Sequence, residues 1–405
     1  MSARAAATPT TPPDRSRGTL GVLFGVVVVD LIGFGIVMPV LPFFAAAHGA
    51  DGATLGLIMT AYAAAQFAFA PLWGRLSDRF GRRPVLLVTI AGTAVGLLAL
   101  GLAGSIAAIV AARLLGGAFA ANLGVASAYI ADVTPASERT RWMGLLGASF
   151  GVGFVLGPAI GGLLAPYGES VPLLAAAGLA GLNWVQALLF LREPPAREAA
   201  AEGAGRRLAE LRDPLVRRIC GVNLLFSLGV TQLETMFAFY MARRFGWDAR
   251  AVAFVLVAMA VLMGAIQGGG MKALSARFAD RSLVLVGSGL LAIGFFALPE
   301  AESMPLLYAA LVLAAVGRAG AQPALMSLAS QAAPPARRGA VMGAFQSAAS
   351  LARVVGPLAA GALFDRAIAA PFVLAGALLV LTLALAWGLP ARVAAPGAVG
   401  EPGPA

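Results

Sequence analysis

A series of apolar runs, each about as long as a membrane-crossing helix, constrains this chain more than any other feature. A helix that crosses the hydrocarbon core needs about 20 predominantly apolar residues. By that rule the sequence predicts spans near 20–42, 55–73, 85–104, 107–130, 142–165, 172–191, 219–241, 250–270, 283–299, 305–329, 341–363 and 370–389. A charged stretch, 192–218, divides these twelve runs into six and six. The pattern predicts an all-α integral membrane protein of two six-helix bundles.

The composition agrees with a protein that faces lipid. Hydrophobic residues make up 60% of the chain and charged residues 12%, whereas soluble domains average about 25% charged residues. We expect bundles at 19–191 and 219–390, a cytoplasmic linker at 192–218, and disordered cytoplasmic tails at 1–18 and 391–405. The first apolar run is too long for a secretory signal and carries Asp30 in its middle, so we expect a retained span.

The basic residues indicate the orientation of the spans. The net charge is +10, but the arginines and lysine occur in short clusters between the apolar runs. That arrangement is typical of the positive-inside rule and does not favour nucleic-acid binding. With the N-terminus inside, the outer loops hold only Arg243, Arg244, Arg250 and Arg366. We therefore predict that both termini are cytoplasmic.

The chemistry-bearing residues exclude several classes of protein. The chain has a single cysteine, Cys220, and a single histidine, His48. These leave no internal disulfide and no metal-ligand cluster. Because the sequence also has no nucleophile–base pair and no phosphate-binding loop, we expect no enzyme, no metal and no cofactor.

The two halves of the chain repeat each other. Gly157-Pro158 recurs as Gly356-Pro357, 199 residues later, and Leu76-Ser77 recurs as Leu274-Ser275, 198 residues later. A duplicated half predicts bundles related by pseudo-two-fold symmetry. In transporters with such parallel repeats the substrate path lies between the halves near the bilayer midplane.

The charged loop Trp73–Pro84 separates two apolar runs. Its defining residues are Gly74, Asp78, Arg79, Gly81, Arg82 and Arg83. A loop that only fixed topology would need basic residues but no glycine or aspartate at set positions. Gly74–Pro84 resembles the loop-2/3 signature of the major facilitator superfamily, and the resemblance implies the major facilitator fold. It also implies that Asp78 closes the cytoplasmic side against the start of the eleventh helix, near Gly339, since an anion is stabilised at a helix N-terminus.

The second copy of this loop is degraded. Lys272–Arg281 keeps Leu274, Ser275 and Arg277, but Ala276 stands where the carboxylate would be. We therefore expect the cytoplasmic latch to be asymmetric between the halves.

Two charged residues within spans are candidates for proton coupling. Asp30 lies about eleven residues into the first span, roughly 16 Å deep. A carboxylate there costs several kcal/mol unless it is hydrated, partnered or protonated. A structural bond to a neighbouring helix is the alternative role. Arg113 in the fourth span must also be paired or hydrated, with Asp30 as one conceivable partner and packing as the alternative. Asp30–Phe43 resembles the first-helix motif of drug:proton antiporters, and Arg113 resembles the family's fourth-helix arginine motif.

The fifth span is rich in glycine. Its motif consists of Gly144, Gly153, Gly157, Pro158, Gly161 and Gly162. Small residues four apart let helices approach closely, so generic packing is one interpretation. In the major facilitator superfamily the whole pattern marks antiporters, and the resemblance implies that direction of transport.

Further polar residues lie at membrane depth in both halves. Glu234 is the acidic residue well inside a span of the second half, and it either binds a cation or a proton or forms an ion pair with Arg318 or Arg353. We expect the substrate cavity to be lined by Gln66, Asn122, Gln232, Glu234, Gln322 and Arg318. Arg318 and Arg353 are alternatively contacts for an anionic substrate.

Within the superfamily, Thr60–Pro84 and Ala128–Gly162 resemble tetracycline efflux pumps. Those pumps carry intramembrane aspartates in the third and ninth helices, where this chain has Gly96 and Leu291. The departures put the handling of a metal–tetracycline cation in question.

Together these features predict a proton-driven antiporter that exports small amphipathic compounds from the bacterial inner membrane by alternating access. Its expected partners are the substrate, protons and lipid, and we expect a monomer. A major facilitator exporter or importer of a metabolite or siderophore is the first alternative. A transporter-like sensor or assembly factor without turnover is the second.

Overall fold

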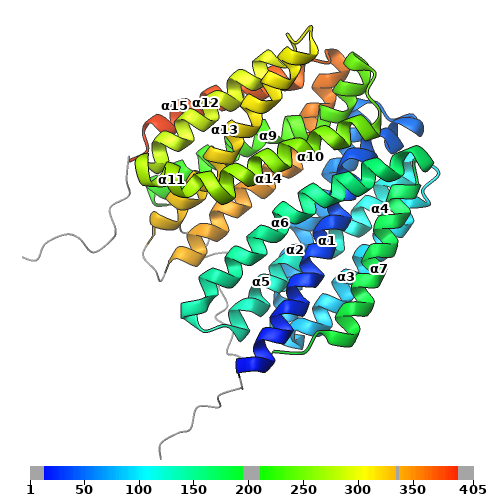
Figure 1. The fold of residues 1–405 in the computed structure, drawn as a ribbon, viewed down its shortest axis with the longest axis vertical. Helices are drawn as coiled ribbons and strands as arrows, with labels where there is room; N and C mark the ends of the chain where they lie inside the picture. Colours follow the sequence, from blue (N-terminus) through cyan, green and yellow to red (C-terminus); the bar gives the residue numbers. More distant parts are fainter. Residues whose placement is uncertain (1–12, 195–209, 211, 334–336, 391–405) are drawn as a thin grey trace, which may run out of the picture.

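The structure is a computed structural model that describes residues 13–194, 210, 212–333 and 337–390. Within these residues twelve helical segments are long and apolar enough to cross a membrane, and every regular element is a helix. The predicted all-α fold with twelve spans is confirmed. Figure 1 shows the helices gathered into two groups, one for each half of the chain.

The first group contains seven α-helices and one short 3₁₀ turn. They are α1 (Pro13–Ala47), α2 (Gly52–Phe80), α3 (Arg82–Gly101), α4 (Ile106–Phe119), α5 (Asn122–Val133), α6 (Ala136–Leu164), η1 (Ala165–Tyr167) and α7 (Val171–Phe190).

The second group begins after the linker. Its elements are α9 (Pro214–Phe245), α10 (Ala249–Ala265), the π-helical turn η2 (Ile266–Gly270), α11 (Met271–Arg277), α12 (Asp280–Ala297), α13 (Met304–Gln331), α14 (Arg338–Arg366) and α15 (Ala370–Trp387).

The helices begin earlier than the apolar runs suggested. α1 starts at Pro13, so the prediction of a disordered tail up to residue 18 is wrong for its last six residues. α9 starts at Pro214, inside the stretch assigned to the linker, where Asp213 caps the first turn. The reason is that an apolar run marks only the part of a helix inside the membrane, while the helix itself can continue into water. The predicted C-terminal tail and most of the predicted linker lie outside the described residues.

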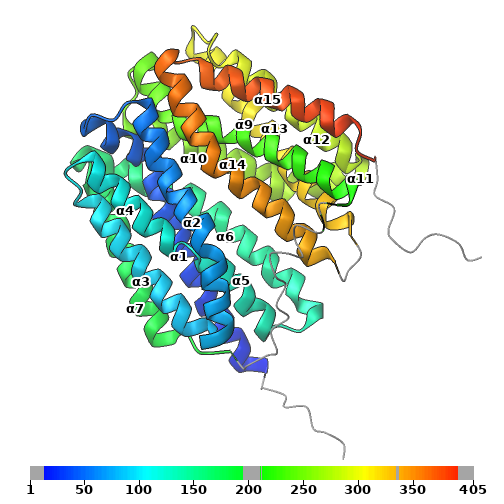
Figure 2. The same cartoon turned by 180° about the vertical axis from the view of Figure 1, so that it is seen from behind.

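The two bundles meet along two helix pairs. α2 packs against α14 and α6 packs against α10 (Figures 1 and 2). We call the end of the molecule that carries Trp73–Pro84 and the start of α14 the basic end. The opposite end, with Gly52 at the start of α2 and Arg366 at the end of α14, is the far end. The ribbons of the halves converge at the far end and diverge toward the basic end (Figure 2).

The fourth span is broken, although the sequence predicted one continuous helix at 107–130. α4 ends at Phe119 and α5 begins at Asn122. A helix break leaves carbonyl groups without intrahelical partners. Here α2 satisfies them, because Trp73 Nε1 donates to Ala118 O (2.6 Å) and Gln66 Nε2 donates to Ala120 O (2.9 Å). The break thereby places Asn122 at the first turn of a new helix in the middle of the bundle.

The eighth span is also irregular. α10 passes through the π-helical turn η2, which contains Gly268, Gly269 and Gly270, before it continues as α11. Single π turns within helices are uncommon and mark local departures from regular packing. No such turn interrupts α2, the corresponding helix of the first half.

Candidate functional site

The far end of the interface between the halves is closed by backbone contact. A Cβ added to Gly56 would lie 2.3 Å from Pro357 O, and one added to Gly361 would lie 2.1 Å from Gly52 O. Side chains at these positions would therefore collide with backbone of the other half. Glycine lets α2 and α14 approach this closely.

An aspartate of one half caps a helix of the other half at the same end. The carboxylate of Asp365 in α14 accepts hydrogen bonds from Gly52 N (2.8 Å) and Ala53 N (2.7 Å) at the start of α2. The next free amide of α2, Thr54 N, donates to the local cap Asp51 (2.8 Å), and this bonding lowers the pKa of the Asp51 carboxyl. The first three amide groups of α2 are thus satisfied, two of them by the opposite bundle.

The glycine motif of the fifth span divides between two partners. Cβ atoms added to Gly153, Gly157 and Gly161 would meet the backbone of α1, at 2.9, 2.5 and 2.8 Å. A Cβ added to Gly162 would meet Ala253 of α10 in the other half, at 2.5 Å. Gly144 faces open space and takes no part in the packing.

The repeat seen in the sequence reappears in this packing. Gly157 lies against Gly35 of α1, and Gly356 lies against Thr231 of α9. The two glycines are 199 residues apart, so equivalent positions pack α6 on α1 and α14 on α9.

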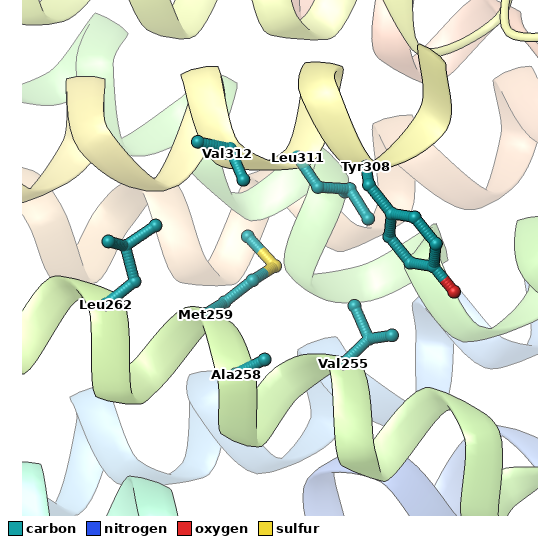
Figure 3. A pocket seen from close by; sticks show the side chains of 7 residues that line it. All are labelled: Val255, Ala258, Met259, Leu262, Tyr308, Leu311 and Val312. Carbon is teal, nitrogen blue, oxygen red and sulfur yellow. The ribbon is translucent and has the colours of Figure 1, made fainter. Parts of the chain in front are cut away.

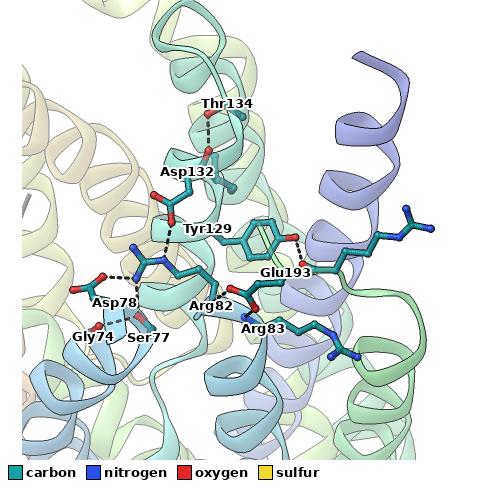
Figure 4. Close-up of polar contacts among 11 residues, drawn as sticks. Gly74, Ser77, Asp78, Arg82, Arg83, Tyr129, Asp132, Thr134 and Glu193 are labelled. Carbon is teal, nitrogen blue, oxygen red and sulfur yellow. Dashed lines mark hydrogen bonds and ion pairs between the residues drawn. The ribbon is translucent and has the colours of Figure 1, made fainter. Parts of the chain in front are cut away.

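The charged loop at the basic end joins four helices (Figure 4). Arg82 Nη1 donates to Asp78 (2.5 Å) and to Ser77 Oγ (2.7 Å) in α2, while its Nε donates to Asp132 in α5 (2.7 Å). Glu193, just after α7, accepts hydrogen bonds from the backbone amides of Arg82 (2.7 Å) and Arg83 (2.9 Å) and so caps α3.

Two details of the loop explain its fixed sequence. Gly81 has a φ of 98°, and a Cβ there would lie 2.5 Å from Glu193. The position therefore requires glycine both for its backbone conformation and for space. The Arg83 side chain donates to Leu191 O (2.6 Å) and Leu188 O (2.8 Å), which satisfies carbonyl groups at the end of α7. Arg79 lies over the ring of Phe80, with 5.1 Å between its guanidinium carbon and the ring centroid.

Asp78 is exposed and its carboxylate bonds within its own half. The latch predicted between Asp78 and the start of α14 is not formed in this conformation. Near that start, Arg337 is instead paired with Glu210 of the linker, which raises the pKa of Arg337. The contact of Asp78 with the start of α14 in another conformation stays a prediction.

Asp30 is half-buried in the middle of α1 and is held by one amide. Asn122 Nδ2 donates to Asp30 Oδ1 at 2.7 Å. Asn122 is itself buried, and its Oδ1 has no hydrogen-bond partner among the described residues. No ion pair with Arg113 is formed in the described chain. The break in the fourth span thus supplies the partner of the carboxylate.

Arg113 is buried beside an aromatic ring. Its guanidinium carbon lies 4.0 Å from the centroid of the Tyr62 ring, which is cation–π distance. Its Nε is buried and has no hydrogen-bond partner among the described residues. Asp30, Arg113 and Arg353 all lie within electrostatic reach of the Tyr62 hydroxyl, so these charges share one region between the halves.

The second half contains an ion pair at membrane depth. Glu234 of α9 and Arg318 of α13 are 2.6 Å apart, and both side chains are about a quarter exposed, at 27% and 26%. Arg318 Nε also donates to Gln322 Oε1 one turn further along α13 (3.4 Å). Of the alternatives that the sequence left open, the structure therefore has the pairing of Glu234 with Arg318.

The remaining polar candidates differ in role. Gln66 bridges to the broken fourth span, as described above. Gln232 is buried, and its amide donates to Leu228 O (3.3 Å) and Gly356 O (3.2 Å). In this conformation its side chain fastens α9 to α14, and its assignment to the cavity lining stays a prediction.

The positions that departed from the tetracycline pumps are both tightly packed. A Cβ added to Gly96 would lie 2.7 Å from the Cα of Gly116, so α3 and α4 touch through glycines there. Leu291 is buried, and its backbone amide lies 2.6 Å from the place of a Cβ on Gly317. An added side chain at Gly96 would collide with α4, and position 291 is occupied by a buried leucine.

A small pocket lies between α10 and α13 (Figure 3). Its volume is about 120 Å³, and its lining is Val255, Ala258, Met259, Leu262, Tyr308, Leu311 and Val312. It contains none of the predicted site residues. Within the described residues no group of three or more histidine, cysteine or acidic side chains is placed to hold a metal ion.

The sequence reasoning assigned no role to Asp132, Glu193 or Asp365. Each stands near a helix end, where an acidic side chain is ordinary. The partner of Asp365 is 313 residues away in the chain, so no local pattern indicates it. Tyr62 was noticed only as part of the family resemblance, and its contact with Arg113 depends on how α2 and α4 pack.

Two pseudo-repeated helix bundles with buried charges between them define a secondary-transporter architecture. Comparison with known proteins agrees with this class. The sequence model of the Major Facilitator Superfamily matches residues 23–299 and 235–403. The chain belongs to this superfamily.

Relatives with curated descriptions include efflux proteins. The class D tetracycline resistance protein of Salmonella ordonez is 34% identical over 355 residues, which cover 84% of this chain and 88% of that protein. Multidrug resistance protein 1 of Bacillus subtilis (strain 168) is 28% identical over 388 residues, or 94% of this chain and 99% of that protein. The protein is thus a transporter related to tetracycline and multidrug efflux pumps.

Solved structures show the same fold. The human organic anion transporter MFSD10 (TETRAN) has a TM-score of 0.70 and 27% identity, with 93% of this chain and 100% of that chain covered. A bacterial homolog of the human lysosomal transporter Spinster has a TM-score of 0.74 over 93% of this chain and 96% of that chain. Its 17% identity makes it a likeness of fold alone.

Proposed function

We propose that the protein is a proton-coupled antiporter that exports small amphipathic compounds across the bacterial inner membrane by alternating access. In this proposal the basic end is cytoplasmic, because the positive-inside rule places arginine-rich loops there. The far-end contacts then close the outer side. The described conformation is the one that receives substrate from the cytoplasm.

The observation that carries the proposal is the state of Asp30. A carboxylate in the middle of a span is costly unless it has a function or a strong partner. Asp30 has one amide donor, through Oδ1, and no cationic partner among the described residues. Its second oxygen, Oδ2, therefore remains available to take up a proton.

Asn122 suits both protonation states of Asp30. As described, its Nδ2–H group donates to the charged carboxylate. Its Oδ1 lacks a partner, so a rotated amide would accept a hydrogen bond from the neutral acid. The pair can thus keep one hydrogen bond in both protonation states, as a group that gains and loses protons in each cycle requires.

The driving force is sufficient for concentrative export. Each proton that enters supplies about 1.4 kcal/mol per unit of pH difference and about 2.3 kcal/mol per 100 mV. One or two protons therefore support a concentration ratio of roughly ten- to a thousand-fold.

Replacement of the carboxylate tests proton coupling. Asp30→Asn keeps the shape and accepts the bond from Asn122 but cannot take up a proton. In everted vesicles we expect it to abolish substrate-induced release of a respiration-generated pH gradient while the protein remains folded in the membrane. Asp248→Asn is the matched control, since Asp248 only caps α10 and asparagine caps about as well. Undiminished proton movement in Asp30→Asn would refute the assignment.

Transport of an endogenous metabolite is the second candidate function. The similarity to a human organic anion transporter supports it. So does the absence of the two intramembrane aspartates of the tetracycline pumps, where this chain has Gly96 and Leu291. A compound panel in the same vesicles separates the two candidates, because a tetracycline among the active compounds would show that the missing aspartates are dispensable.

A further inference from the structure

Arg353 lies on the side of α14 that faces the space between the halves. The exposed residues Leu351, Val355 and Leu358 mark one side of this helix as apolar. Gly356 is against α9 and Gly361 is against α2. At 3.6 residues per turn, Arg353 falls between these two contact sides and opposite the apolar side.

Its surroundings agree with this direction. One residue further along α14, Val354 O accepts a hydrogen bond from Thr60 Oγ1 of the other half (2.9 Å). Arg353 is within electrostatic reach of Tyr62, also in the other half. The side chain is nevertheless exposed. An exposed arginine in mid-span that faces away from lipid is hydrated through the space between the bundles.

Arg353 has no anionic partner in the described chain. Its one hydrogen bond is to Ser350 Oγ, a neutral group three residues earlier (3.1 Å). The two carboxylates at this depth have other partners, since Glu234 binds Arg318 and Asp30 binds Asn122. The group of charges between the halves therefore contains three arginines and two carboxylates, with Arg113 as the third arginine.

We propose that Arg353 binds an acidic group of the transported compound, so that the transport path selects amphipathic organic anions. This inference rests on the proposed export function and names its substrate class. A guanidinium forms two parallel hydrogen bonds with a carboxylate or sulfonate, which gives orientation as well as attraction. Tyr62, on the facing helix, offers a ring surface for the apolar part of the same molecule.

The charge balance favours an anion over a cation. Among the described residues a cationic compound would meet two arginines without an anionic partner, Arg113 and Arg353, and only one carboxylate outside an ion pair, Asp30. An anion needs no existing pair to break.

Binding of two dyes that share one xanthene core tests the proposal. Fluorescein is anionic and rhodamine 123 is cationic, and both are followed by fluorescence anisotropy with the purified full-length protein in detergent. We expect wild type to bind fluorescein more tightly than rhodamine 123. Arg353→Gln should weaken fluorescein binding about ten-fold or more, since a charged hydrogen-bond partner is lost. Its rhodamine 123 binding should stay the same or improve.

Two further variants separate charge recognition from damage to the fold. Arg353→Lys keeps the charge but loses the bidentate geometry, so we expect intermediate affinity for fluorescein. Arg366→Gln removes an exposed arginine at the far end and should leave the affinity for both dyes unchanged. Unchanged rhodamine 123 binding in Arg353→Gln would show that the protein is intact.

Several outcomes would overturn the proposal. They are absence of fluorescein binding, equal loss of both dyes in Arg353→Gln, or unchanged fluorescein affinity in that variant. Equilibrium binding needs no turnover, so a failure of proton coupling in Asp30→Asn would leave this result as it stands. The two proposals can therefore fail independently.

Discussion

The two ends of the α2–α14 pair differ in how they hold the halves together. At the far end, Gly52 and Gly361 bring the backbones into contact, and Asp365 of α14 caps α2. At the basic end, Asp78 of α2 is exposed and bonds to Arg82 of its own half. Each helix thus carries an aspartate near its C-terminal end, at the end of the molecule where the partner helix begins, but of these two only Asp365 bonds across the interface among the described residues.

This difference suggests that alternating access uses the same type of contact, a carboxylate at a helix N-terminus, at both ends of the interface. A carboxylate at a helix N-terminus is stabilised by free amide groups and by the helix dipole. In the proposed cycle Asp365 caps α2 while the outer side is closed, and Asp78 makes no contact with α14. When the basic end closes, Asp78 caps α14 and Asp365 releases α2. Each step then exchanges one helix cap for another, which keeps the two states close in free energy.

Substitution of a glycine in the α2–α14 contact at the far end should cause the largest loss of transport. Gly56→Leu would place side-chain atoms on Pro357 O, where the backbone cannot rotate away. Overpacking typically costs about 1–3 kcal/mol, so we expect about a hundred-fold loss of transport with the far end held open. Spin labels on Gly104→Cys and Glu302→Cys would report a longer distance between the far ends. Gly178→Leu is the control, because a side chain at this position faces open space; it should change neither transport nor the distance between the labels.

Removal of the Asp365 carboxylate, which caps α2 across the interface, should lower the population with a closed far end by an intermediate amount. Asp365→Ala leaves two amides of α2 without their acceptor. The loss of an N-cap costs about 0.5–2 kcal/mol, so the population with a closed far end should fall about two- to thirty-fold. The same pair of labels measures the shift. Asp51→Ala is the comparison, because Asp51 caps α2 within its own half and should lower stability without moving the equilibrium.

A substitution at the basic end should change the population with a closed far end the least, and should raise it where the other two substitutions lower it. Asp78→Asn removes the charge that the proposed latch needs, while the far end is untouched. We expect the population with a closed far end to rise about two- to five-fold, from the 0.3–1 kcal/mol that a charge contributes at a helix N-terminus. A fall in that population, or no change together with normal transport, would contradict the latch.

Much of the fold was predictable because its signals are local. The spans follow from apolar length, and the charged loop is specific at Gly81, whose positive φ admits few residues other than glycine. The break at Ala120 was not predictable, because no proline marks the site and the freed carbonyl is satisfied by Gln66 from another helix. The start of α1 was misjudged because hydropathy does not register helix that continues into water.

The candidate site was predictable only in part. Asp30 and Arg113 stand out because charge is rare inside a span. Their partners, Asn122 and the Tyr62 ring, come from helices distant in sequence. Gln232 was assigned to the cavity because polarity alone does not distinguish a lining residue from one that bonds to a neighbouring helix.

The membrane class, the two-fold repeat and the family can be predicted from the sequence alone, since each depends on length, spacing or a short motif within one segment. Which charges are paired and which are left over depends on how the helices pack. The tertiary structure joined Glu234 to Arg318, placed Asp365 on α2 and left Arg353 without an anion among the described residues. The physical reason is that a side chain's partner is set by how helices are rotated and packed against each other, and a single sequence does not record that rotation.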